Sequence, residues 1–94
     1  MNVRICQWFE GKKAALSFRF DDSHTTHIEK AIPILNEFGF GGTFLINPGN
    51  PRYAQYGEVW ESTVLELGDH TMNHRGAKTD ADAEEQIGEC ARHI

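Results

Sequence analysis

Two short apolar segments with an amphipathic segment between them constrain the fold of this 94-residue chain more than any other feature. Residues 14–20 and residues 43–47 are rich in aliphatic and aromatic side chains, and each segment is bounded by glycine, proline or acidic residues. Both segments therefore predict buried β-strands. A strand, a helix and a second strand in so short a span predict one βαβ unit with parallel strands and a right-handed crossover.

The segment between the two strands predicts the crossover helix. Thr26 and Glu29 match a capping box at its start, and Gly39 is a typical residue just beyond a helix end. Pro33 predicts a kink or a later start, because proline has no N–H to donate and clashes with the preceding turn. The apolar residues recur at helical spacing and predict one buried stripe. The stripe consists of Ile28, Ala31, Ile32, Leu35 and Phe38.

A third strand and a final helix are expected further along the chain. Residues 58–63 predict a short helix, residues 64–68 predict a strand, and residues 81–94 predict a helix with Asp80 as its N-cap. The predicted buried side of the last helix is formed by Ile87, Cys90, Ala91 and Ile94. The fold class is therefore predicted to be α/β, with parallel βαβ units and three strands.

Composition and charge exclude several classes of partner. The net charge is −5 with lysine and arginine scattered, which differs from the basic patch of a nucleic-acid-binding protein. No stretch approaches the roughly 20 apolar residues that a membrane span needs, so neither a membrane nor a nucleic acid is an expected partner. Residues 1–13 lack the apolar core of a signal peptide, which predicts a cytoplasmic protein, or a secreted one if an upstream signal was removed. Cys6 and Cys90 favour two free thiols over one long-range disulfide.

Two pairs of polar residues follow predicted strands. Asp21 and Asp22 end the first strand, and His70 and His74 follow the third. The carboxyl ends of parallel strands are where ligands bind in α/β folds. Two imidazoles and one carboxylate hold a divalent ion with a position left open for water, and the other carboxylate is then available as a base. Each pair alone is also typical of turn-forming acids or surface histidines, so the combination is what favours a metal site.

These residues resemble the motifs of the polysaccharide deacetylases, the NodB-homology proteins of carbohydrate esterase family 4. The resemblance spans about residues 14–76 and is carried by Phe20-Asp21-Asp22, by Gly41-Gly42-Thr43-Phe44, and by Gly68-Asp69-His70-Thr71-Met72-Asn73-His74. It implies a distorted (β/α) barrel, a carbohydrate substrate, and a divalent metal ion that is usually zinc and sometimes cobalt or another ion. It also implies that Asp21 is the catalytic base and that Asp22, His70 and His74 are the metal ligands.

The chain departs from the family pattern in three respects. Arg19 stands where the family has a small hydroxyl residue, and it shares a strand face with Asp21. It would either pair with Asp21 and lower the basicity of that carboxylate, or turn outward. The family's Arg-x-Pro, Asp-Trp and late Leu-x-x-His segments are missing, and three strands do not close a barrel. We therefore expect residues 1–94 to be a partial, truncated deacetylase-like domain whose open sheet edges favour self-association.

Two hypotheses for the function remain open at this stage. The first is a metal-dependent hydrolase that removes N-acetyl or related acyl groups from a carbohydrate by attack of metal-bound water on the amide carbonyl. The second is a catalytically incomplete metal-binding module that needs further chain or a partner subunit. Tyr53, Tyr56 and Trp60 would stack on a sugar or, as we favour, pack within a loop. His24 and His27 are expected to be surface residues at a helix start.

Overall fold

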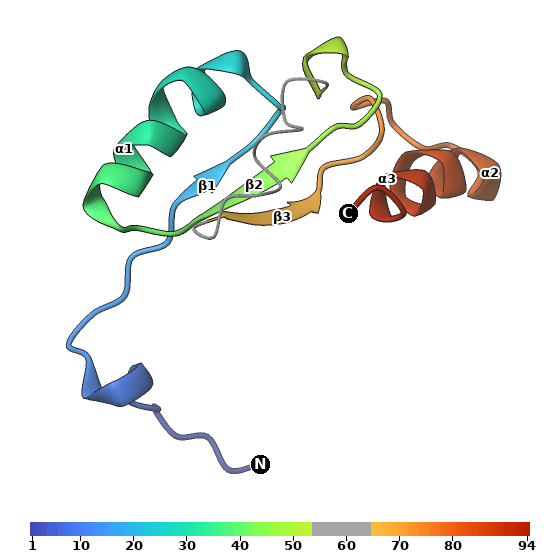
Figure 1. The fold of residues 1–94 in the computed structure, drawn as a ribbon. Helices are drawn as coiled ribbons and strands as arrows, with labels where there is room; N and C mark the ends of the chain where they lie inside the picture. Colours follow the sequence, from blue (N-terminus) through green and yellow to red (C-terminus); the bar gives the residue numbers. More distant parts are fainter. Residues whose placement is uncertain (54–64) are drawn as a thin grey trace.

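The computed structural model describes residues 1–53 and 65–94, and it contains one parallel sheet (Figure 1). The sheet has the order β1-β2-β3, formed by β1 (Arg19–Phe20), β2 (Gly42–Ile46) and β3 (Leu65–Asp69). The α/β class and the parallel strands are therefore confirmed. The short helix predicted for residues 58–63 lies outside the described residues, as do Tyr56 and Trp60.

Strand β1 is much shorter than predicted. Its ladder pairs Arg19 with Thr43 and Phe20 with Phe44, and Phe18 adds one hydrogen bond from its carbonyl oxygen to the Thr43 N–H at 3.0 Å. Residues 14–17 are exposed. The register explains the difference, because β2 begins at Gly42 and offers no strand opposite the residues before Phe18.

The crossover segment begins with a π-helical turn, η2 (His27–Ala31), and continues as α1 (Ile32–Phe38) on one face of the sheet (Figure 1). This change of helix type occurs directly before Pro33, where the sequence predicts an irregularity. The predicted stripe is largely confirmed, although Phe38 at its end is 64% exposed. The buried core consists of Ile32 and Leu35 from α1 with Phe44 and Ile46 from β2.

The helical segment ends as predicted at Gly39, but its start lacks the predicted capping box. Thr26 occupies the N-cap position of η2 as predicted, but the capping box is not formed: its backbone is helical, and its hydroxyl lies 2.9 Å from Nδ1 of His24 instead of capping the next turn. Gly39 ends the helix as expected, in the left-handed conformation with φ of 66°. The Phe40 N–H then donates to the Leu35 carbonyl at 2.9 Å, as in a Schellman motif.

The final helical segment comprises α2 (Asp80–Ala83), η4 (Glu84–Gly88) and α3 (Glu89–Ala91). Its N-cap is Thr79 and not Asp80: Thr79 Oγ1 accepts the Asp82 N–H at 3.1 Å, and Asp82 Oδ2 accepts the Thr79 N–H at 3.0 Å. This is a capping box, in which a threonine and an acid three residues later satisfy each other's backbone donors.

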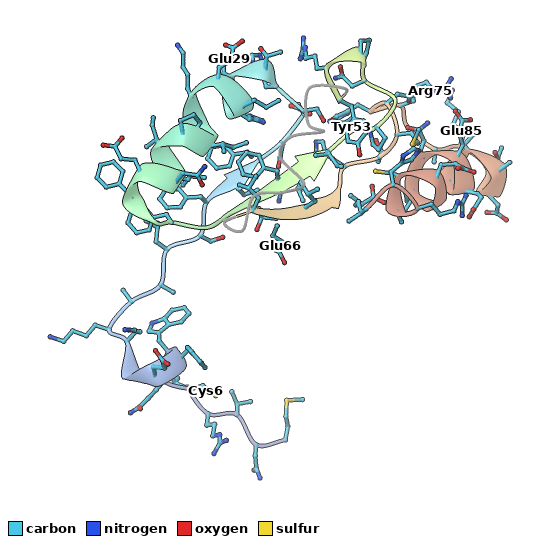
Figure 2. All side chains as sticks on the ribbon, viewed as in Figure 1. Cys6, Glu29, Tyr53, Glu66, Arg75 and Glu85 are labelled. Atoms are coloured by element: carbon cyan, nitrogen blue, oxygen red, sulfur yellow. The ribbon has the colours of Figure 1, made fainter. Side chains whose placement is uncertain are left out.

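The predicted buried side of this segment is wrong apart from Cys90. Gln86 and Cys90 are buried, while Ile87 is 54% exposed. Hydrogen bonds explain this choice, because the Gln86 carbonyl accepts the Met72 N–H at 2.8 Å and thereby docks the segment on the loop after β3. Figure 2 shows Arg75 beside Glu85, an ion pair that joins the same loop to the same segment.

Both cysteines are free thiols. Cys6 is exposed in the N-terminal segment that runs away from the sheet (Figures 1 and 2), whereas Cys90 is buried. Burial raises the pKa of the Cys90 thiol to about 11. No helix in the described ranges is long and apolar enough to cross a membrane.

The two thiols are expected to differ in reactivity. In a mildly alkaline solution of Ellman's reagent, Cys6 reacts at once and Cys90 reacts only after a denaturant is added, because the thiolate is the reactive form and burial disfavours it. Absorbance of the released chromophore counts the thiols. Two equally fast thiols in the folded protein would contradict the burial of Cys90, and no reactive thiol after denaturation would indicate a disulfide.

Candidate metal centre

Two loops meet at the carboxyl end of the sheet. Asp22 lies on the loop that follows β1, and His70 and His74 lie on the loop that follows β3, while β2 runs between these two strands (Figure 1). Neighbouring strands in a sheet are about 4.8 Å apart, so side chains from β1 and β3 meet only by reaching over the end of β2. The structure brings three of the four predicted site residues together in this way.

Three donor atoms converge in this cluster. Oδ1 of Asp22 lies 3.1 Å from Nε2 of His70 and 3.2 Å from Nε2 of His74, and the two Nε2 atoms are 3.1 Å apart. In a tetrahedral zinc site with bonds of about 2.0 Å, neighbouring donor atoms are about 3.3 Å apart. The donor types and their spacing therefore fit a divalent ion such as zinc.

The cluster is open to solvent on one side. The side chains of Asp22 and His74 are 59% and 65% exposed, and that of His70 is 20% exposed. Three protein donors with an accessible face are typical of catalytic zinc sites, in which the remaining position takes water or substrate. The two rings also contact each other edge to face, with centroids 4.8 Å apart.

Left-handed backbone conformations are concentrated in the two loops. Of the five non-glycine residues with positive φ in the described ranges, four belong to these loops. They are Asp22 (71°), Ser23 (47°), Thr71 (67°) and His74 (65°). Such conformations are disfavoured for residues with a Cβ atom, and they accumulate at functional sites where neighbouring contacts hold them. Of the two adjacent aspartates, only Asp22, whose backbone is left-handed, belongs to the cluster.

Asp21, the fourth predicted site residue, is held by Arg19 and is not part of the cluster. Arg19 donates from Nε to Oδ1 at 2.8 Å and from the terminal guanidinium nitrogen to Oδ2 at 2.9 Å. These hydrogen bonds lower the pKa of the Asp21 carboxyl below its usual value. Of the two arrangements left open for Arg19, the structure thus has the paired one.

Thr71 and Asn73 lie between the two histidines, at positions from which side chains can orient imidazole rings by hydrogen bonds. Instead, Thr71 Oγ1 accepts the His74 N–H at 3.1 Å, and the Asn73 side-chain oxygen accepts the Arg75 N–H at 3.3 Å. Both side chains therefore stabilise the turn of the backbone and do not contact the rings.

His24 and His27 lie at the start of the helical segment, as expected, but His27 is half-buried and not a surface residue. His24 is exposed and contacts Thr26, whereas His27 packs edge-on against Phe20 and Phe44 with centroid distances of 5.4 and 5.7 Å. Burial lowers the pKa of His27, so its neutral form is favoured. Neither histidine belongs to the three-residue cluster.

Two buried polar residues next to the cluster were not singled out from the sequence. Ser23 is fully buried and Asn47 is 2% exposed. Asn47 directly follows β2, so the rule that ligands bind at the carboxyl ends of parallel strands is a signal that would have identified it. The apolar pattern instead placed Asn47 at the end of the predicted strand 43–47, directly before Pro48, and gave it no part in the site.

Comparison with known proteins gives one match. A family model described as polysaccharide deacetylase matches residues 10–94, a range that includes all four predicted site residues. No curated protein and no solved structure matches the chain.

Proposed function

Because the chain belongs to the polysaccharide deacetylase family, we propose that it is a metal-dependent hydrolase that removes an N-acetyl or related acyl group from a carbohydrate. The observation that carries the proposal is the convergence of Asp22, His70 and His74 on one point beside an ionised Asp21. Two imidazoles and a carboxylate favour zinc among the common ions, with cobalt as a substitute.

In this proposal Asp22, His70 and His74 hold the ion. A divalent ion held there would supply Lewis acidity, polarising the acyl carbonyl and lowering the pKa of a water molecule bound beside it. Both histidines must present a lone pair on Nε2, so each carries its proton on Nδ1.

Asp21 is proposed to be the general base. Its carboxylate accepts a proton from the attacking water, while Arg19 fixes the orientation of that carboxylate through both oxygens. The bond from the water oxygen to the acyl carbon forms, and the carbon–nitrogen bond breaks as the proton taken up by Asp21 passes to the leaving nitrogen. The products are a carboxylic acid and the free amine of the sugar, and Asp21 is again a carboxylate.

The second candidate function is a metal-binding module that becomes active only with further chain or a partner subunit. It is supported by the sheet, because β1 and β3 each pair with a single strand within the described ranges. Apolar side chains of α1 and of the turn after it are also exposed, among them Ile34, Phe38 and Phe40. A closed (β/α) barrel, or self-association, would cover edges and faces of this kind.

Acetate release tests the proposed hydrolase. The purified chain is incubated with chitooligosaccharides and with peptidoglycan fragments, after removal of metal by a chelator and after addition of zinc. We expect acetate to be released only by the zinc-loaded protein. A folded sample that binds zinc and releases no acetate from any of these substrates would contradict the hydrolase and favour the metal-binding module.

Arg19 is expected to support the base without contributing to metal binding. Arg19→Leu removes both hydrogen bonds to Asp21 and should lower kcat on the order of tenfold, because a misplaced catalytic group loses much of its effect. Arg19→Lys should recover only part of the loss, since a lysine cannot form the same two-pronged contact. The control is Arg92→Leu, which breaks the surface ion pairs with Glu84 and Glu89. Equal zinc content with an unchanged kcat in Arg19→Leu would contradict this role.

A further inference from the structure

We propose that Asn47 is a positioning residue that fixes the separation of the two loops carrying the candidate metal ligands, and thereby sets the affinity for the ion. The inference rests on the proposed function, because it concerns the same site. It adds a residue that belongs neither to the ligand set nor to the acid–base chemistry.

Asn47 is bonded to both halves of the site. Its side-chain Nδ2 donates to the carbonyl oxygen of His70 and, at 3.0 Å, to that of Thr71. Its backbone N–H donates to Oγ of Ser23 at 2.8 Å. Since Ser23 directly follows Asp22, a single residue at the end of the central strand connects the carboxylate ligand to the histidine ligands.

Few other side chains at position 47 could form the same hydrogen bonds. Both acceptors of the Asn47 side chain are carbonyl oxygens, so only a group with two donors on one atom serves both. Asn47 is 2% exposed and Ser23 is fully buried, so water does not replace a lost hydrogen bond. A buried polar group left without its partner is costly, and the loops are therefore expected to shift when either contact is removed.

The two loops that Asn47 contacts contain strained backbone. Ser23 and Thr71 both have positive φ, at 47° and 67°. Left-handed conformations persist where surrounding contacts determine them, and the three hydrogen bonds of Asn47 are such contacts. Releasing them gives each loop a route to a more favourable conformation, which moves Asp22 and His70 apart.

Other contacts should keep a variant at this position folded. The His70 N–H donates to the Ile46 carbonyl at 3.0 Å, and the Gly49 N–H donates to the Met72 carbonyl at 2.7 Å. Both are backbone hydrogen bonds, so substitution of the Asn47 side chain leaves them in place. The loop after β3 thus stays attached to β2 while its fine position changes.

The test compares zinc affinity in three variants of the full chain. Asn47→Leu removes the side-chain donors without adding charge, and Ser23→Ala removes the acceptor on the other loop. The control is Thr43→Val, which breaks the 2.7 Å hydrogen bond from Thr43 Oγ1 to Glu66 at the opposite end of β2; Figure 2 labels Glu66. The dissociation constant is measured by competition with a chromogenic chelator, and thermal unfolding of the metal-free forms is followed in parallel.

Asn47→Leu and Ser23→Ala are each expected to weaken zinc binding by about 10- to 100-fold, as is typical when groups that orient metal ligands are removed. Thr43→Val should leave zinc affinity unchanged although it loses a hydrogen bond of similar length. A wild-type zinc affinity in both site variants, or an equal loss of zinc affinity in the control, overturns this inference but not the proposed function. If Asn47→Leu does not fold, Ser23→Ala decides the matter by itself. A wild-type chain that binds no zinc overturns the proposed function and this inference together.

Discussion

Replacing His70 with alanine is expected to remove zinc from the protein while leaving the sheet folded. His70 is the most enclosed of the three candidate ligands, and its Nε2 lies 3.1 Å from both Asp22 Oδ1 and His74 Nε2. The two remaining donors do not complete a zinc site, so we expect the dissociation constant to rise at least about 100-fold. Metal content after dialysis, measured by mass spectrometry, should fall from one zinc per chain to none.

The control for this experiment is His93→Ala. The His93 ring packs edge-on against the Tyr53 ring, with centroids 6.3 Å apart, and it lies outside the cluster. Its removal should therefore leave the zinc content unchanged. The experiment also distinguishes two interpretations of the short distances between the three donor atoms. The first is a metal site, and the second is a cluster held by hydrogen bonds alone, since a carboxylate and two imidazoles can share hydrogen bonds without any metal. Full zinc occupancy in His70→Ala would favour that second interpretation and contradict the metal site.

Asp21→Asn is expected to lower kcat by about 10²- to 10⁴-fold while zinc affinity stays at the wild-type value. An amide cannot take the proton of the attacking water, but it keeps one oxygen for the Arg19 guanidinium, so the loop should keep its shape. Acetate release from chitooligosaccharides gives kcat, and chelator competition gives the zinc affinity of the same sample.

The adjacent aspartate provides the matched control. Asp22→Asn replaces a ligand whose Oδ1 faces both histidines, so it should weaken zinc binding and lower activity together. The two neighbouring residues therefore have distinguishable phenotypes. Loss of zinc in Asp21→Asn would identify Asp21 as a ligand, and retention of full activity would exclude it as the base.

The meeting of the Asp21-Asp22 pair with His70 and His74 could be predicted from the sequence because it depends on topology, whereas the assignment of Asp22 as the ligand was implied by the family resemblance. Parallel strands place their carboxyl ends at one edge whatever the details of packing, so motifs that end two such strands lie close together. The apolar stripe with Ile32 and Leu35 could also be predicted, since the helical period of the sequence defines it whatever the details of packing.

Features that depend on single hydrogen bonds could not be predicted in this way. Thr79 and Asp80 are adjacent and both are typical N-caps, so the hydrogen bonds of the capping box decide between them. The last helical segment docks through the contacts of Gln86 and not through the apolar residues of that segment. The pairing of Arg19 with Asp21 depends on a side-chain rotamer. The role of Asn47 could not be predicted, because its burial and its hydrogen bonds to Ser23 and Thr71 are tertiary properties that the pattern of residues 43–47 does not contain.

The most direct measurement is anomalous diffraction at the zinc edge from crystals of the zinc-loaded protein. We expect one anomalous peak about 2.0–2.2 Å from a carboxylate oxygen of Asp22 and from Nε2 of His70 and of His74, with Asp21 beyond bonding distance. A peak at other residues, such as the exposed thiol of Cys6, or no peak between these three side chains, would contradict it.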